Sequence, residues 1–277
     1  MTDQSKKAAS TINYFADNPI STASEDLLQR SKFVERIVRE IDMIDASQGY
    51  VLAVMGQWGS GKTSVLNLVK GCLKNKEMLV VDYNPWLLSG TEALVAGLFG
   101  EINAQLKQRG KQYRSIATKM LRYSELVAPF AAIPVAGSWS AGLLAMASFA
   151  RKFRELRSVS VAAQKEQVTK ALGSVDHPIV VIIDDIDRLD RSEIREIFKL
   201  VRLTASFPNV VYILSFDRTR VEIALTEDGV PGRSYLEKIV QHGFELPAIP
   251  DKVFIREVTQ ALALALEDVD VRFDQEV

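Results

Sequence analysis

One segment near the start of the chain has the residue types and the spacing of a loop that binds phosphate. Residues 56–63 read GQWGSGKT, which fits the pattern G-x-x-x-x-G-K-[ST]. Glycines let such a loop curl until its backbone amides point inward, and the helix that follows adds a partial positive charge. We expect a triphosphate to contact Gly56, Gln57, Trp58, Gly59, Ser60, Gly61, Lys62, Thr63 and Ser64.

Two side chains of this loop have expected roles of their own. Lys62 is expected to reach the β- and γ-phosphates and to take part in catalysis, and the Thr63 hydroxyl to be a direct ligand of Mg²⁺. The alternative is a glycine-rich turn that carries a lysine by chance. The buried apolar run at 50–55 and the helical pattern after the loop argue against that alternative, because they supply the strand and helix that this motif requires.

A pair of acids could supply the metal and water side of the same chemistry. The aliphatic run at 179–183 ends in Asp184 and Asp185. Asp184 is expected to hold Mg²⁺ through a water, and Asp185 to polarise the water that attacks the γ-phosphate. The alternative is an acidic, solvated start of a loop. Arg188, nearby, is expected to form a structural ion pair rather than to act as a transition-state finger.

A third group of polar residues follows another apolar run, at 209–216. Ser215, Asp217 and Arg218 are expected at the sheet edge where α/β proteins bind ligands. Ser215, Asp217 or Arg218 could therefore sense the γ-phosphate. An ordinary polar end of a strand remains the alternative.

The elements that must position these residues alternate between strand and helix. Buried strands are predicted at 50–55, 78–83, 178–185 and 209–216, with a shorter one at 242–246. Helices are predicted at 24–44, after the glycine loop, and at about 91–124, 151–172, 192–206 and 250–266. This alternation indicates an α/β fold of three layers with a central, mostly parallel sheet, and with a helical insert between the loop and Asp184.

Composition narrows the class of protein without naming a partner. The formal net charge of -1 gives no bulk basic field, so there is no strong signal for nucleic acid. A single cysteine and an N-terminal stretch without an apolar core favour the cytoplasm.

Several segments together resemble the KAP family of P-loop NTPases, from about residue 17 to residue 247. The resemblance is carried by DNPI (17–20), EDLLQR (25–30), YNPW (83–86), IIDDIDRLD (182–190), ILSFDR (213–218) and YLEKIVQHGFELP (235–247), in addition to the glycine loop. It implies an ASCE-type, STAND-related ATPase core that uses ATP and Mg²⁺. It also implies that the nucleotide state regulates attached modules, in bacterial phage defence or in membrane-associated signalling.

On this basis the chain is divided into three parts. Residues 1–16 are expected to be a flexible tail, 17–247 the KAP-like domain with an insert at about 91–172, and 248–277 the start of a truncated helical region.

The insert contains an uncharged stretch, 126–150, in a place where KAP-like proteins frequently carry transmembrane helices. Its length suits one crossing of a bilayer, which would put the glycine loop and Asp184 on opposite sides of the membrane. We therefore favour a helical hairpin that is buried or binds a partner, either an effector protein or a second copy of the chain. Peripheral contact with the inner face of the cell membrane and a true span remain the alternatives.

Three functions fit these observations. The favoured one is Mg²⁺-dependent hydrolysis of ATP coupled to a conformational change, with ATP preferred over GTP because no Asn-Lys-x-Asp signature occurs. The second is a nucleotide-gated scaffold with negligible hydrolysis. The third is a small-molecule kinase, which the tandem acids and the lack of an arginine-rich lid disfavour.

Overall fold

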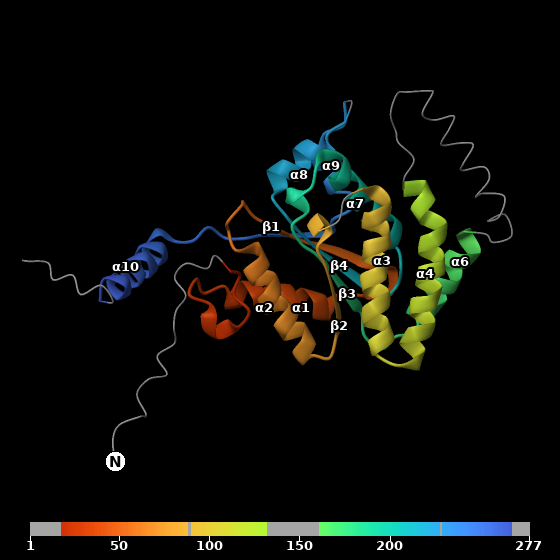
Figure 1. Cartoon of the computed structure of the whole chain (residues 1–277), viewed down its shortest axis with the longest axis horizontal. Helices are drawn as coiled ribbons and strands as arrows, with labels where there is room; N and C mark the ends of the chain where they lie inside the picture. Colours follow the sequence, from red (N-terminus) through yellow and green to blue (C-terminus); the bar gives the residue numbers. More distant parts are fainter. Residues whose placement is uncertain (1–17, 88–89, 132–160, 228, 268–277) are drawn as a thin grey trace, which may run out of the picture.

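The computed structural model describes residues 18–87, 90–131, 161–227 and 229–267. Its strands form one five-stranded sheet in the order β2-β3-β4-β1-β5, and every neighbouring pair is parallel (Figure 1). The expected α/β fold with a parallel central sheet is confirmed. The strands are β1 (Tyr50–Met55), β2 (Leu79–Tyr83), β3 (Ile179–Ile183), β4 (Val210–Phe216) and β5 (His242–Glu245).

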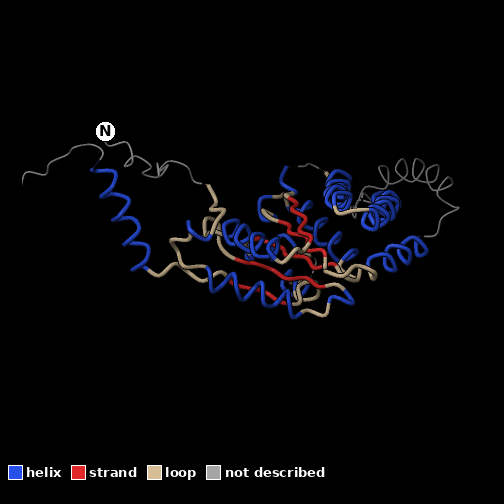
Figure 2. The backbone as a smooth tube through the Cα atoms, turned by 90° about the horizontal axis from the view of Figure 1, so that it is seen from below, coloured by secondary structure: helices blue, strands red, loops and turns tan. Residues whose placement is uncertain are grey.

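Helices cover both faces of this sheet, which gives three layers (Figure 2). Helices α1 (Ser31–Met43) and α2 (Lys62–Asn75) pack on one face. The other face carries α3 (Thr91–Gln108), α4 (Lys111–Ala131), α6 (Val161–Leu172), α7 (Arg191–Thr204), α8 (Arg218–Leu225) and α9 (Gly232–Leu236).

The alternation of side chains along each strand explains the two cores. In β1, Leu52 and Val54 belong to the core under α1 and α2, whereas Val51 and Ala53 belong to the opposite core. Both sets are fully buried. Because helices cover both faces of the sheet, the side chains of β1 from Val51 to Met55 are buried, which explains why its sequence is a continuous apolar run.

The parallel register brings the expected chemical residues to one edge. Met55 of β1 pairs with Phe216 of β4, and Ile183 of β3 pairs with Leu214 of β4 and with Tyr83 of β2. The residues that follow these strands therefore emerge side by side. Strand β4 lies between β1 and β3, so it separates the strand before the glycine loop from the strand before Asp184.

Two predicted helices differ from the structure. The helix expected from Ser24 begins at Ser31, because the Asp26 carboxylate accepts hydrogen bonds from the backbone of Arg30 and Ser31 and holds the preceding segment in a turn. The helix expected at 91–124 is two helices, α3 and α4. The chain turns between them at Gly110, where φ is +122°.

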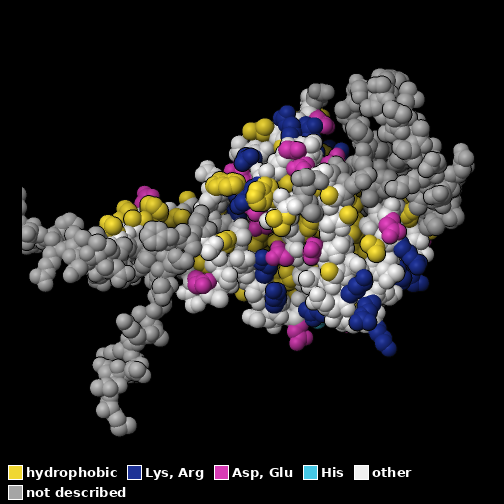
Figure 3. Space-filling model, viewed as in Figure 1, with side chains coloured by type: hydrophobic (Ala, Val, Ile, Leu, Met, Phe, Trp, Pro, Cys, Tyr) yellow, Lys and Arg dark blue, Asp and Glu magenta, His cyan; other side chains and the backbone are white. Residues whose placement is uncertain are grey.

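Short 3₁₀ helices join the main elements: η1 (Ala23–Glu25), η2 (Ala46–Gln48), η3 (Pro85–Leu87) and η4 (Ile186–Arg188). After β5 the chain runs to α10 (Asp251–Glu267), which lies apart from the sheet at the left of Figure 1. Apolar side chains are exposed along α10 (Figure 3), among them Phe254, Ile255, Val258 and Leu262.

Two predictions concern segments outside the described residues: the tail at 1–16 and most of the apolar stretch at 126–150. Within the part of the chain that the structure describes, no helix has the length and apolar character needed to cross a membrane. The described part of the insert is a packed helical layer, since α3 contacts α4 and α4 contacts α6.

Candidate nucleotide site

The glycine loop runs from the end of β1 to the start of α2. Gly59 and Gly61 have φ of +73° and +89°, in the left-handed region that glycine adopts at little cost. At Gly56 a Cβ atom would lie 2.6 Å from Ser60 Oγ and 3.1 Å from Leu246 Cβ, so a side chain there would displace its neighbours. The loop therefore curls back on itself at the N-terminus of a 14-residue helix, which is a geometry suited to an anion.

Lys62 lies across the loop that precedes it. Its side chain is 9% exposed, and Nζ donates hydrogen bonds to the carbonyl oxygens of Gly56 and Gln57 at 3.0 and 3.2 Å. The carboxylate of Asp187, which is 2% exposed, lies 3.9 Å from the same ammonium group. The lysine is thus held by two neutral acceptors and one distant charge, partners that a phosphate oxygen can replace.

The two acids after β3 occupy different environments. Asp184 is buried, and its Oδ1 accepts a hydrogen bond from the amide of Asp185 at 2.8 Å. Asp185 has a φ of +58°, which turns its side chain toward Arg188 and Asn84. One carboxylate oxygen lies 2.7 Å from Arg188 Nε, and the other accepts a hydrogen bond of 3.1 Å from Asn84 Nδ2.

Residues from the loop and from the acidic segment share one cavity of about 480 Å³. Thr63 from the start of α2 lines it together with Asp184 and Asp185. The remaining lining residues come from β2, from the segment after β2, and from α2 and α3: Lys70, Asp82, Tyr83, Asn84, Leu87, Gly97 and Glu101. The structure thus brings the predicted metal-binding hydroxyl and both predicted acids together, although they are about 120 positions apart in the sequence.

Three buried polar atoms around the loop have no hydrogen-bond partner among the described residues: Ser60 Oγ, Asp187 Oδ1 and Ser215 Oγ. A buried polar atom without a partner costs about 1–3 kcal/mol, so such atoms mark places where a ligand can add hydrogen bonds. Ser60 is in the loop, where its hydroxyl could donate a hydrogen bond to a phosphate oxygen. Asp187 is beside Lys62, where its carboxylate oxygen could accept a hydrogen bond from a water on the metal ion.

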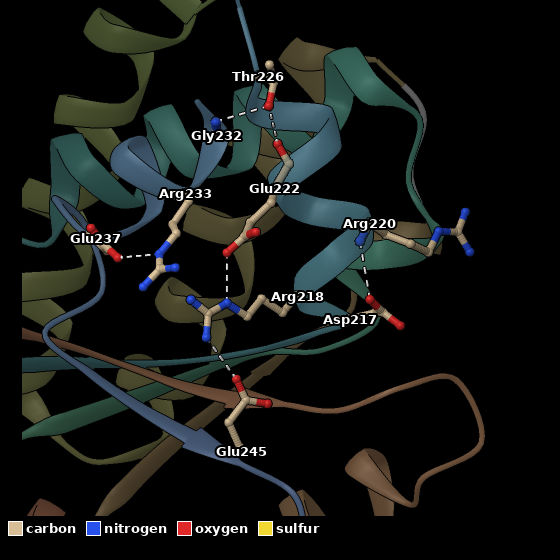
Figure 4. A network of polar contacts seen from close by, with 9 residues as sticks. All are labelled: Asp217, Arg218, Arg220, Glu222, Thr226, Gly232, Arg233, Glu237 and Glu245. Atoms are coloured by element: carbon tan, nitrogen blue, oxygen red, sulfur yellow. Dashed lines mark hydrogen bonds and ion pairs between the residues drawn. The ribbon is translucent and has the colours of Figure 1, made fainter. Parts of the chain in front are cut away.

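The predicted sensor residues make other contacts (Figure 4). The Asp217 carboxylate accepts a hydrogen bond from the amide of Arg220 and so caps α8. Arg218 lies between Glu222 and Glu245, at 2.7 and 3.1 Å, and the hydrogen bond to Glu222 is the main cause of its raised pKa. Ser215 is completely buried in β4. Their role as sensors stays a prediction.

Comparison with known families identifies the family of this chain. The model described as the KAP family P-loop domain matches residues 30–271, most of the chain. The chain belongs to the KAP family. The resemblance seen in the sequence is therefore confirmed, and the loop at 56–63, the predicted P-loop, lies within the matched residues.

One related protein matches most of this KAP domain. It is 30% identical over 279 residues to the phage T7 exclusion protein of Escherichia coli (strain K12), an alignment that covers 90% of this chain and 37% of that protein. The chain thus spans little more than a third of the length of that relative.

Two solved structures are similar to it at lower identity. Cdc6p from Pyrobaculum aerophilum is 15% identical with a TM-score of 0.47, over 88% of this chain and 52% of that one. The Walker-type ATPase PABY2304 of Pyrococcus abyssi is 13% identical with a TM-score of 0.45, over 94% and 63%.

The site also contains Asn84, Asp187 and Trp86, for which no role was predicted from the sequence. Asn84, in the YNPW segment, binds Asp185, and Asp187 lies beside Lys62. Trp58 and Trp86 flank the Arg188 guanidinium, with ring centroids 4.7 and 5.5 Å from Cζ. Asp187 could have been predicted as a site residue because it is three positions after Asp184 in the sequence. The contacts of Asn84 and Trp86 could not, because they depend on the order of the strands in the sheet.

Proposed function

We propose that this KAP domain binds ATP together with Mg²⁺, hydrolyses it to ADP and phosphate, and couples the change of nucleotide to a change of conformation. The proposal rests on one observation: Thr63, Asp184 and Asp185 line a single cavity that adjoins the P-loop. Membership of the KAP family supports it, because P-loop domains bind nucleoside triphosphates through this loop.

Each element of the site contributes one group to this chemistry. The backbone amides of the loop and the ammonium of Lys62 would bind the β- and γ-phosphates, with Lys62 exchanging its two carbonyl partners for phosphate oxygens. Thr63 Oγ1 would bind Mg²⁺ directly and Asp184 through a water. The metal ion neutralises charge on the phosphates when it is bound.

Hydrolysis then requires an acceptor for one proton. The oxygen of a water forms a bond to the γ-phosphorus, the bond from that phosphorus to the bridging oxygen breaks, and ADP leaves with the electron pair. Asp185 is the carboxylate we assign to orient this water and to take its proton, because it lines the cavity next to Asp184.

A nucleotide-gated scaffold is the second candidate, and a specific contact favours it. Both carboxylate oxygens of Asp185 are already engaged, one by Arg188 and one by Asn84. A domain held in this arrangement would bind ATP and turn it over slowly until a partner released Asp185. ATP turnover should be measured for the monomer and for the self-associated form. Only the scaffold predicts that turnover rises on self-association.

For the biological setting we propose bacterial phage defence, with a nucleotide-dependent signal passed to attached modules. The name of the related phage T7 exclusion protein supports this setting. The insert at about 91–172 is the proposed contact for an effector protein, a second copy or the membrane surface. Lysine and arginine side chains gather at the end of α3 and the start of α4 (Figure 3), among them Lys107, Arg109, Lys111 and Arg114.

Two substitutions test the enzymatic proposal. Lys62→Ala removes the group that faces the phosphates, so ATP affinity should fall roughly 100-fold or more. Asp185→Asn keeps the shape of the side chain but removes the base, so binding should remain while phosphate release falls roughly 100-fold. Lys74→Ala, at an exposed lysine on the same helix, is the matched control. ATP affinity by calorimetry and phosphate release measure the two effects.

Equal phosphate release by Asp185→Asn and by the wild type would remove Asp185 from the mechanism. Wild-type protein that binds ATP but releases phosphate only in the self-associated form would favour the scaffold.

A further inference from the structure

Arg188 joins three segments that meet at the mouth of the P-loop. It belongs to η4, which follows Asp184 and Asp185. Its guanidinium lies 4.7 Å from the ring of Trp58, in the P-loop, and 5.5 Å from the ring of Trp86, after β2. Its Nε lies 2.7 Å from the carboxylate of Asp185. One cation therefore contacts the loop, the proposed base and the segment after β2.

This arrangement leaves Asp185 with a donor on each oxygen. Arg188 occupies one oxygen and the Asn84 amide occupies the other. Each carboxylate oxygen keeps a second lone pair, but the two donors fix the orientation of the carboxylate and compete with water for its oxygens. Loss of either partner would let Asp185 turn toward the attacking water.

Arg188 is the partner that is easier to displace. Its side chain is 35% exposed, and the tryptophan rings that flank it are 61% and 53% exposed, so solvent weakens each contact. A guanidinium also binds phosphate oxygens through two parallel hydrogen bonds, as it does a carboxylate. A triphosphate seated in the P-loop is therefore a competitor for the same donors.

We propose that Arg188 changes partner when ATP binds, from the carboxylate of Asp185 to the γ-phosphate. The exchange frees Asp185 at the moment when the substrate is complete, and it breaks the stack with Trp58 and Trp86. ADP lacks the third phosphate and leaves the Arg188–Asp185 pair in place. This inference rests on the proposed function and adds a residue that distinguishes ATP from ADP.

The affinity ratio of the two nucleotides tests the exchange directly. In the wild type a non-hydrolysable ATP analogue should bind more tightly than ADP, and in Arg188→Ala this preference should shrink by about tenfold while ADP affinity stays within twofold. Arg188→Lys, which keeps the charge without the planar fork, should lose part of the preference. Arg36→Ala, at an exposed arginine on α1, is the matched control. Circular dichroism and thermal unfolding verify that each variant is folded.

Tryptophan fluorescence provides a second readout that does not depend on turnover. The chain contains three tryptophans, and Trp139→Phe leaves Trp58 and Trp86 as the only two that contribute to the emission. In this background the Mg²⁺ complex of the ATP analogue should change the emission of Trp58 and Trp86, ADP should change it much less, and Arg188→Ala should abolish the difference.

The outcomes separate this inference from the function on which it rests. A protein that binds neither nucleotide overturns both. Binding of the analogue with an unchanged emission, or an unchanged preference for the analogue over ADP in Arg188→Ala, overturns the role of Arg188 and leaves the ATPase proposal intact.

Discussion

At the residue scale, the candidate site depends on one strained backbone position. Asp185 has a φ of +58°, a region that few residues other than glycine adopt, although aspartate does so more readily than most. The strain turns a carboxylate out of the line of β3 and toward Asn84 and Arg188. Such strain is more common at functional sites than elsewhere, which agrees with the role proposed for Asp185.

A neighbouring aspartate has a structural role that can be measured. The Asp190 carboxylate caps α7 by accepting a hydrogen bond of 2.8 Å from the amide of Glu193, and this bond is the main cause of its lowered pKa. Asp190→Ala should lower the free energy of unfolding by about 1 kcal/mol at pH 7. Chemical denaturation at several pH values measures the effect.

The pH dependence of this effect has a definite sign. A lowered pKa in the folded state means that the ionised carboxylate stabilises the fold above the unfolded pKa, and that this contribution is lost as the pH falls through the folded pKa. The difference between the wild type and Asp190→Ala should therefore shrink below about pH 3.9. Asp190→Asn, which keeps an oxygen acceptor without the charge, should remain close to the wild type at pH 7; a loss as large as that of alanine would contradict the capping role.

At the scale of elements, one arginine joins two helices behind the site. Arg195 of α7 donates hydrogen bonds of 2.8 Å to the carbonyl oxygens of Ala224 and Thr226, and it pairs with Glu227 at 2.9 Å. It thereby satisfies carbonyl groups at the C-terminal end of α8 that the helix itself leaves unpaired.

Removing this contact should loosen α8 from α7. Arg195→Met keeps the aliphatic part of the side chain, and it should cost about 2 kcal/mol of unfolding free energy. Arg202→Met, at an exposed position of the same helix, is the matched control and should cost less than about 0.5 kcal/mol. Equal losses in the two variants would show that the contacts with α8 contribute nothing specific.

The strands could be predicted from the sequence because each is a continuous apolar run. The predicted run at 50–55 is β1 itself, and the run at 209–216 differs from β4 by one residue. The start of α1 could not be predicted in this way, because it depends on hydrogen bonds from the backbone to Asp26.

The order of the strands in the sheet, and the contacts that depend on it, could not be predicted from the sequence patterns. The position of β4 between β1 and β3 depends on long-range pairing, and so do the contacts that Asn84 and Trp86 make with the segment after β3. The loop motif and the tandem acids could be identified because their chemistry is local to a few residues. That they line one cavity could be established only from the order of the strands in the structure.

At the scale of the whole molecule, a ligand bound at the sheet edge should stabilise both cores. A ligand present at about 100 times its Kd, if it binds only the folded state, adds roughly 2.7 kcal/mol. For a domain of this size that corresponds to a rise in Tm of roughly 5–10 °C. Differential scanning fluorimetry with Mg²⁺ and a non-hydrolysable ATP analogue measures the shift.

Lys62→Ala should abolish this stabilisation, because it removes the ammonium that lies across the loop. The control Lys74→Ala should retain it. A shift of equal size in Lys62→Ala would place the binding site of the nucleotide elsewhere in the molecule.

The most direct test of the shared site is the dependence of ATP affinity on Mg²⁺. Wild-type affinity should fall about tenfold or more when a chelator removes the metal ion, and Thr63→Ala and Asp184→Asn should each lose most of that dependence, while Thr63→Ser, which keeps the hydroxyl, should retain it. A magnesium dependence that is the same in wild type, Thr63→Ala and Asp184→Asn would contradict a metal ion held jointly by α2 and the end of β3.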